Sequence, residues 1–192
     1  MVSILTPDVL VKAYCMGIFP MGGDDGAIRW YSPDPRCIID LNTFSPSRRL
    51  LRTYRKGVFE LRANSAWDQV IRECAERETT WISDAIIRSY TELHRLGIAH
   101  SVEAYSNGQL AGGLYGVSVG GAFMGESMFH FVTDASKVCL VYLVERLKER
   151  GYVLLDCQYM TDHLRTFGAQ LISRDQYLHR LNEALQLNCR FD

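Results

Sequence analysis

The sequence predicts an α+β fold in which helices flank a mixed β-sheet. Strand-like segments surround the dipeptides Asn-Gly at 107–108 and Gly-Gly at 120–121, which indicates two consecutive antiparallel hairpins. A strongly apolar helix is expected over 134–151. The segment YVLLDCQ at 152–158 is too apolar for the edge of a sheet, so we expect a parallel strand in the interior.

The 192 residues suit a small N-terminal subdomain at 1–57 followed by a main domain at 58–192. A formal net charge of −1 excludes binding of polyanions through overall charge, so contact with nucleic acid requires a local basic patch. The chain has no apolar run of about 18 residues and no secretion signal, so we expect a cytoplasmic protein without a membrane partner.

Helices and short strands alternate through the first hundred residues. Thr6 and Pro7 start a helix that Gly17 ends, and an apolar loop is expected at 18–21. The remaining elements of this part are strands at 28–32, 37–41 and 58–63, and helices that begin at Ser45, Ser65 and Ser83, the last ending at Gly97.

The C-terminal half starts with a half-buried strand at 100–105. After the hairpins, the long helix and the buried strand, we expect a short helix at 163–167, a strand at 169–172 and an amphipathic helix at 175–187. Hairpins that lead into a β-α-β unit match the mixed sheet of GNAT-type acyltransferases. This analogy concerns the fold and assigns no reaction.

The glycine-rich segment 110–137 carries a candidate binding site. Glycines within strands allow a close approach of another backbone or of a ligand. Glu126 and Ser127 lie in apolar surroundings, which favours a lined pocket in which Glu126 attracts a cation; the alternative is a buried, hydrogen-bonded acid. Ser127 does not fit the hydrolase motif GxSxG, because position 129 is Phe.

Asp156 and Gln158 end the predicted buried strand, where open α/β sheets bind ligands. Alternation along a strand places both side chains on one face and Cys157 on the other. A carboxylate there can orient an amine and a glutamine can position it; the alternative is a pair satisfied by backbone amides. Cys157 near His163 suggests a thiol nucleophile, but the orientation of Cys157 speaks against it.

The helix that begins near Ser45 has a cationic face, which contacts phosphates in one interpretation and is merely solvated in the other. Trp81, like Trp30 and Tyr31, either stacks on a nucleotide base or packs in the core, whereas Trp67 is assigned to the core. The basic residues of this helix are Arg48, Arg49, Arg52, Arg55 and Lys56.

No cofactor is expected. The six cysteines are scattered without a zinc-binding spacing, so we expect reduced thiols and no metal. The Q/RxxGxG/A loop that cradles the pyrophosphate of coenzyme A in GNAT-fold enzymes is absent. Asp134 stands at the helix start where that pyrophosphate requires bare amides.

Several long motifs resemble those of the leucyl/phenylalanyl-tRNA–protein transferase family. They are AYCMGIFPM (13–21), WYSPDPR (30–36), SRRLLR (47–52), CAERETTWI (74–82), LHRLGIAHSVEAY (93–105), the whole segment 110–137, LLDCQ (154–158) and FGAQLISRDQYLHRL (167–181). They run through nearly the entire chain.

This resemblance implies transfer of Leu, Phe or Met from aminoacyl-tRNA to the N-terminal amine of proteins that begin with Arg or Lys, which marks them for the N-degron pathway. Asp156 and Gln158 would form the catalytic relay, and Glu126 would hold the acceptor. Trp81 would stack on the terminal adenosine. The apolar side-chain pocket would include Leu114 and Met128, next to Ser127.

One departure concerns the donor. Family members often have Trp after GIFP, and here Met21 stands in its place, which predicts weaker binding or altered choice of the donor. Related enzymes use acidic N-termini or peptidoglycan precursors as acceptors, and these remain alternatives. A non-catalytic module that binds RNA or N-degrons would explain the basic helix and Glu126, but not the placement of Asp156 and Gln158.

Overall fold

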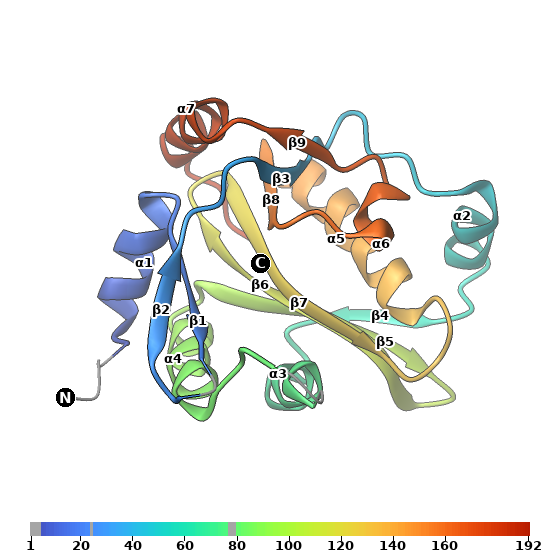
Figure 1. The fold of residues 1–192 in the computed structure, drawn as a ribbon. Helices are drawn as coiled ribbons and strands as arrows, with labels where there is room; N and C mark the ends of the chain where they lie inside the picture. The colour runs from blue at the N-terminus through green and yellow to red at the C-terminus, as the bar shows by residue number, and fades with distance from the viewer. Residues whose placement is uncertain (1–4, 24, 77–79) are drawn as a thin grey trace.

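One mixed sheet dominates the computed structural model, which describes residues 5–23, 25–76 and 80–192 (Figure 1). Within this part of the chain, the strand order is β4-β5-β6-β7-β8-β3-β9, and only β7 and β8 pair in parallel. The strands are β3 (Arg36–Ile39), β4 (Glu60–Ala63), β5 (Ala99–Ser106), β6 (Gln109–Val119), β7 (Ala122–His130), β8 (Leu154–Gln158) and β9 (Gln170–Ile172). The predicted α+β fold, both hairpins and the parallel interior strand are confirmed.

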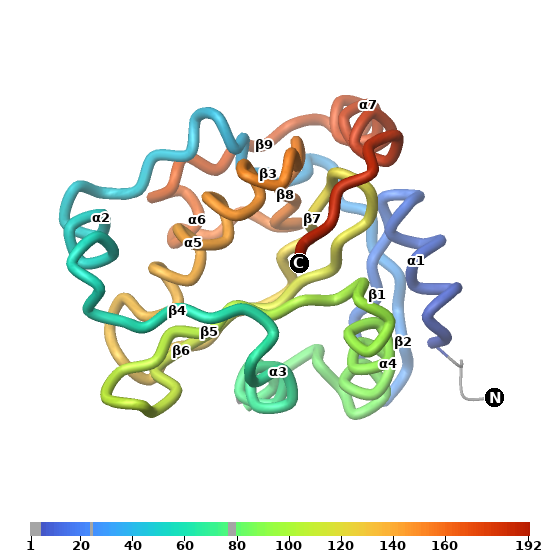
Figure 2. The backbone as a smooth tube through the Cα atoms, turned by 180° about the vertical axis from the view of Figure 1, so that it is seen from behind, coloured from blue at the N-terminus to red at the C-terminus, as the bar shows by residue number. Residues whose placement is uncertain are grey.

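Helices cover both faces of this sheet and enclose two apolar cores (Figures 1 and 2). On one face α5 packs against the long strands, and α2 packs on α5. On the other face lie α1, α3 and α4. The helices are α1 (Pro7–Cys15), α2 (Arg48–Arg55), α3 (Trp67–Ala75), α4 (Asp84–Arg95), α5 (Ala135–Glu149), α6 (Asp162–Arg165) and α7 (Arg174–Leu185). No helix in these ranges is long and apolar enough to cross a membrane.

A second, two-stranded sheet stands beside α1 and consists of β1 (Phe19–Gly22) and β2 (Ile28–Tyr31). The expectation of a loop at 18–21 was therefore wrong, because this segment pairs with β2 in the register Phe19↔Tyr31. β3 belongs to the main sheet although it precedes residue 57. The division at 57/58 stays a prediction.

Local capping signals predicted most helix ends. Thr6 and Ser83 cap α1 and α4 as expected. Ser65 does not cap α3, whose N-cap is Ala66, because the Ser65 hydroxyl donates to Glu103 at 2.8 Å. α2 begins later than expected, after Ser47. Strand β5 is buried on both faces for most of its length, since α5 covers one face and α3 and α4 the other.

After α7 the chain turns back to end at the middle of the molecule (Figure 2). There Phe191 is buried and stacks on His100 and Phe123. Residues 77–79 of the motif CAERETTWI lie outside the described residues.

A bulge in the central hairpin brings two backbones close together. Gly116 of β6 pairs with Gly125 of β7, and the register shifts just before Gly116. A Cβ atom on Gly116 would lie 2.3 Å from the Met124 carbonyl oxygen and 2.4 Å from the Phe123 ring. A Cβ on Gly125 would meet its nearest atom at 3.6 Å, an ordinary contact.

We therefore expect Gly116→Ala to lower the free energy of unfolding by about 1–3 kcal/mol or more, since neither the strand nor the packed ring can give way easily. Gly125→Ala is the matched control on the opposite strand and should cost much less. Urea denaturation measures both values. Equal losses would contradict the close backbone approach.

Candidate active site

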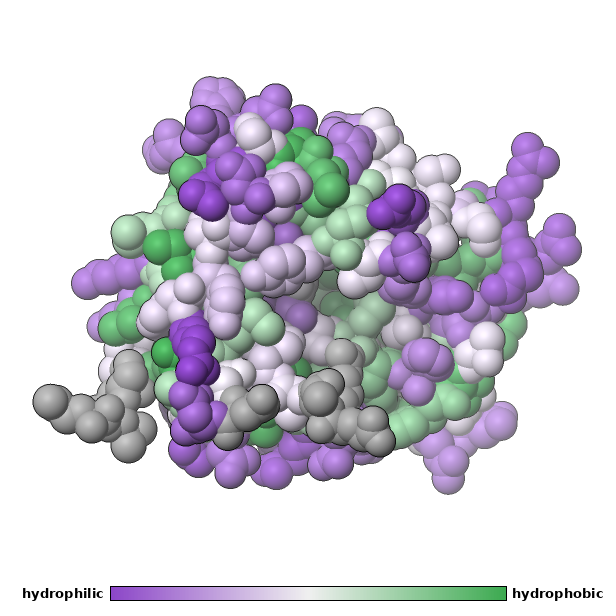
Figure 3. Space-filling model, in the orientation of Figure 1, coloured by the Kyte–Doolittle hydropathy of each residue, from purple (hydrophilic) through white to green (hydrophobic). Residues whose placement is uncertain are grey.

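A cavity of about 730 Å³ opens on the face shown in Figure 3 and lies between the main sheet, α5 and α6. The structure brings together most of the residues that the sequence singled out. The predicted residues that line the cavity are Met21, Trp81, Leu114, Glu126, Ser127, Met128 and Gln158. They come from β1, β6, β7 and β8 and from the segment before α4.

One part of the cavity is apolar. Leu114 and Met128 face each other across the β6–β7 pair. Leu140 and Leu143 of α5 and Leu155 of β8 complete this wall. A pocket of this composition accepts an aliphatic or aromatic side chain by burial alone.

Asp156 does not line the cavity and is fully buried. Arg36 donates to both of its carboxylate oxygens, from Nε at 2.9 Å and from Nη2 at 2.6 Å. The Tyr177 hydroxyl donates at 2.9 Å, and the Gln158 backbone N–H also donates at 2.9 Å. Asp156 therefore does not itself contact the cavity, and it acts there through Gln158 and through the effect of its charge on Glu126.

Arg36 is itself 1% exposed and makes two kinds of contact besides the ion pair. Its Nη1 donates to the Gly17 carbonyl at 3.0 Å, and its guanidinium lies over the rings of Phe19 and Tyr177. The sequence analysis assigned no role to Arg36, and the unusual motif WYSPDPR is the signal that could have drawn attention to it.

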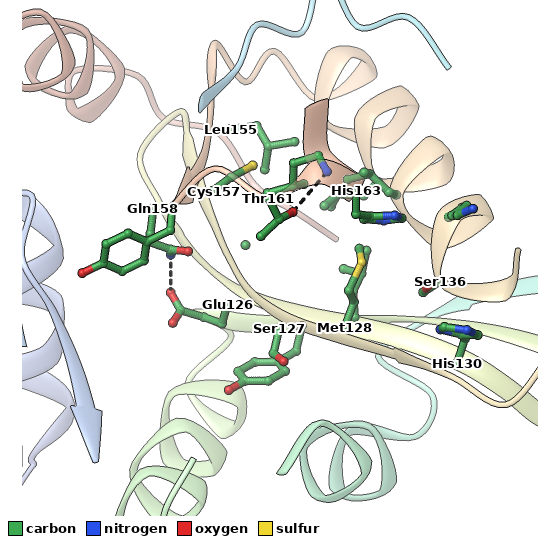
Figure 4. A pocket seen from close by; sticks show the side chains of 18 of the residues that line it. Glu126, Ser127, Met128, His130, Ser136, Leu155, Cys157, Gln158, Thr161 and His163 are labelled. Atoms are coloured by element: carbon green, nitrogen blue, oxygen red, sulfur yellow. Dashed lines mark hydrogen bonds between the residues drawn. The ribbon is translucent and has the colours of Figure 1, made fainter. Parts of the chain in front are cut away.

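Gln158 turns from the strand into the cavity. Its backbone has φ of +58°, and its Nε2 donates to Glu126 Oε1 at 3.2 Å (Figure 4). Cys157 lies on the face of β8 opposite Asp156, as alternation predicts, but it is this face that lines the cavity together with Leu155. The expectation that Asp156 and Gln158 share a face was wrong, because β8 carries a bulge opposite Cys37 and Ile38 and Gln158 has a positive φ.

Glu126 is held by aromatic hydroxyls that the sequence analysis missed. Tyr14 of α1 donates to Glu126 Oε1 at 2.8 Å and also hydrogen-bonds Tyr90 of α4. Burial raises the pKa of Glu126 to about 8, and the charge of Asp156 adds to this, against the opposing effect of the Tyr14 hydrogen bond. The carboxyl can therefore gain or lose a proton near neutral pH.

Polar groups line another part of the wall, and Lys137, His130 and His163 were not predicted. Lys137 forms an ion pair with Asp134 at 3.5 Å. Burial, with the charges of Lys137 and His130, lowers the pKa of His163, which favours a neutral imidazole. Asp134 also accepts two hydrogen bonds from Arg49, at 2.6 and 3.0 Å.

The basic face of α2 therefore has two parts. Arg49 joins α2 to the start of α5 through Asp134. The other cations of the predicted face are exposed next to this junction: Arg48, Arg52, Arg55 and Lys56. Their contact with phosphate stays a prediction.

Trp81 and Met21 line the cavity from neighbouring segments, since the Gly22 N–H donates to the Trp81 carbonyl at 2.9 Å. Trp30 and Tyr31 are not among the residues that line it. Trp67 packs in the core as expected, where its indole N–H donates to Thr91 at 3.0 Å. All six cysteines are free.

Comparisons with known proteins agree with one another. Residues 38–182 match the family model "Leucyl/phenylalanyl-tRNA protein transferase", and residues 4–34 match the model of the N-terminal domain of that protein. The chain is 55% identical over 188 residues to the leucyl/phenylalanyl-tRNA–protein transferase of Rubrobacter xylanophilus, covering 97% of this chain and 98% of the relative. It is 51% identical over 192 residues to that of Gloeobacter violaceus, covering all of both chains.

A solved structure of a functionally unknown conserved protein from Staphylococcus epidermidis is also similar. It has a TM-score of 0.48 and 12% identity, and the match covers 86% of this chain and 64% of that one. A GCN5-related N-acetyltransferase-like protein from Streptococcus suis has a TM-score of 0.43, also at 12% identity and with the same coverage.

The raised pKa of Glu126 predicts how stability depends on pH. Between pH about 4.5 and 8 the folded protein keeps a proton on Glu126 that the unfolded chain has lost. The stabilisation is therefore complete below about 4.5 and is lost as the pH rises through 8, with a slope of at most about 1.4 kcal/mol per pH unit.

Glu126→Gln removes this titration, so its free energy of unfolding should vary less between pH 5 and 8 than that of the parent protein, by roughly the slope above. Glu92→Gln, at an exposed carboxylate on α4, is the matched control and should leave the pH profile unchanged. Urea denaturation at a series of pH values makes the comparison. Parallel profiles for the parent and Glu126→Gln would contradict the raised pKa.

Proposed function

Because this chain belongs to the leucyl/phenylalanyl-tRNA–protein transferase family, and is thus an aminoacyltransferase that moves an aminoacyl group from tRNA to proteins, we propose that its acceptors begin with Arg or Lys. The observation that carries this proposal is the charge of the cavity wall. Asp134 is neutralised by Arg49 and Lys137, whereas Glu126 takes part in no ion pair among the described residues. Burial raises the pKa of Glu126 to about 8, so a cationic acceptor beside it favours loss of the proton and pairs with the resulting carboxylate.

The donor fits the rest of the cavity. The Leu, Phe or Met side chain of the aminoacyl ester enters the apolar wall around Leu114 and Met128, beside Ser127. Trp81 stacks on the terminal adenosine, and Met21 packs on the other side of the base, where a thioether gives a weaker contact than an indole ring. The exposed cations of α2 bind phosphates of the tRNA, in a manner that weakens with salt.

The chemistry requires alignment more than activation, because the ester of aminoacyl-tRNA is already reactive towards amines. The acceptor α-amine has a pKa of about 7.7–8.0, so part of it is neutral at pH 7. Gln158 orients this amine. Asp156 holds Gln158 in place by accepting a hydrogen bond from the Gln158 backbone N–H. Glu126, with a pKa of about 8, is matched to exchange a proton with the amine.

The reaction neither gains nor loses a proton overall, because the proton of the amine ends on the departing hydroxyl. The amine nitrogen attacks the ester carbonyl, the carbon–oxygen bond to the ribose breaks, and the amine proton goes to the departing hydroxyl by way of the polar groups around Gln158. The oxyanion is held by backbone amides of the glycine-rich strands, at about 3 kcal/mol for a good donor. The product carries a new N-terminal Leu or Phe, which marks it for cytoplasmic N-degron degradation.

Transfer of labelled Leu from Leu-tRNA to peptides that differ only in their first residue tests the proposal. We expect label on peptides that begin with Arg or Lys and, in the Glu126→Gln variant, an increase in the KM for these peptides on the order of tenfold or more, from loss of the charge that faces the cation. Glu92→Gln should behave like the parent protein.

Label only on peptides that begin with Asp or Glu would keep the reaction and overturn the assignment of acceptor. A protein that binds Leu-tRNA but labels no peptide would favour the non-catalytic module.

A further inference from the structure

Two cysteines meet at the strand end that carries Gln158. Cys37 lies on β3 and Cys157 on the neighbouring strand β8. Cys37 pairs with Gln158 and the next residue, Ile38, pairs with Asp156. Cys157 is therefore the extra residue of a bulge and lies beside Cys37 rather than opposite a partner of its own.

The bulge places Cys157 next to Cys37 on the neighbouring strand, and the two thiols interact, which lowers the pKa of Cys37. The Cys37 thiol also donates to the Met160 sulfur at 3.9 Å. Cys37 is completely buried, whereas Cys157 lines the cavity. A small reagent that enters the cavity thus reaches one thiol directly and finds the second immediately behind it.

The other cysteines have different surroundings. Cys74 and Cys139 are buried in the two apolar cores. The Cys189 thiol is partly exposed and donates to the Gly151 carbonyl at 3.3 Å. Cys189 therefore serves as a comparison for the reactivity of an ordinary surface thiol.

We propose that Cys37 and Cys157 form an oxidation site at which a peroxide generates an intramolecular disulfide, and that this disulfide stops aminoacyl transfer. Formation of the disulfide follows from the sulfur contact and does not depend on the function of the protein. Its effect on transfer rests on the role proposed for Gln158.

The reaction balances with hydrogen peroxide as the oxidant. One thiol attacks the peroxide and becomes a sulfenic acid, with release of one water. The second sulfur then displaces the hydroxyl group, forms the sulfur–sulfur bond and releases a second water. In the reduced protein the interaction between the thiols lowers the pKa of Cys37 and, together with burial, raises that of Cys157, so Cys37 is the sulfur that ionises more readily.

A disulfide between Cys37 and Cys157 would disturb the site, because the two sulfur atoms must come closer together than they are in the reduced protein. The sulfur atoms must come to about 2.05 Å, and the bulge of β8 must move with them. Cys157 lies directly between Asp156, which is fixed by Arg36, and Gln158, whose Nε2 contacts Glu126 at 3.2 Å. Movement of the bulge therefore displaces Gln158.

The experiment treats the full chain with hydrogen peroxide, maps cross-linked peptides by mass spectrometry and assays transfer of Leu from Leu-tRNA before and after reduction with dithiothreitol. We expect a cross-link between the peptides that contain residues 37 and 157, with loss of two hydrogen atoms. Transfer should fall on the order of 100-fold, as for a displacement of about 1 Å at a reacting centre, and should return on reduction.

Cys37→Ser is the informative variant, because Cys37 does not line the cavity and its loss leaves Cys157 in place. Before oxidation it should retain transfer. After oxidation it should show no cross-link and no loss that dithiothreitol reverses. Cys189→Ser is the matched control and should form the cross-link and lose activity like the parent protein.

Failure to form the 37–157 cross-link in the parent protein would overturn the site. A complete cross-link with undiminished transfer would overturn its effect on the reaction. A reduced protein that transfers no Leu would instead count against the proposed function, while the mapped cross-link still decides whether the two thiols react.

Discussion

The buried ion pair between Arg36 and Asp156 is the interaction on which the site depends. It joins strands β3 and β8, and through the Gly17 carbonyl and the Tyr177 hydroxyl it also reaches α1 and α7. Two charges without solvent are costly unless every polar atom has a partner, and here both carboxylate oxygens and two guanidinium nitrogens beyond Nε are hydrogen-bonded. Removing either partner would leave an uncompensated charge in the core.

The pair positions Gln158 and Glu126 indirectly. Asp156 accepts from the Gln158 backbone, and the turn that follows directs the Gln158 side chain to Glu126. Glu126 is in turn held by Tyr14, a residue of α1, which contacts Tyr90. The N-terminal helix therefore does more than cover a core: it supplies a hydrogen bond that stabilises the Glu126 carboxylate and limits the rise of its pKa.

Much of the fold and part of the site could be predicted from the sequence, because strands, turns and helix caps are encoded locally. The dipeptides at 107–108 and 120–121 predicted the hairpins, and the strand end of β8 predicted that Gln158 reaches a site. Arg36, Tyr14 and Tyr177 could not be assigned, since they meet Asp156 and Glu126 from positions far away in the chain. Asp156 and Gln158 were expected on one face of β8, but Gln158 turns to the cavity face, because alternation does not foresee a bulge followed by a positive φ.

We propose that the end of β8 aligns the acceptor and does not hold the donor. A comparison of Gln158→Ala with Gln186→Ala, at an exposed glutamine at the end of α7, in single-turnover transfer and in binding of Leu-tRNA tests this role. We predict that Gln158→Ala binds Leu-tRNA like the parent protein and transfers Leu roughly 10²–10³-fold more slowly, as for loss of one positioned hydrogen-bond donor. Loss of binding in parallel with transfer would contradict the account.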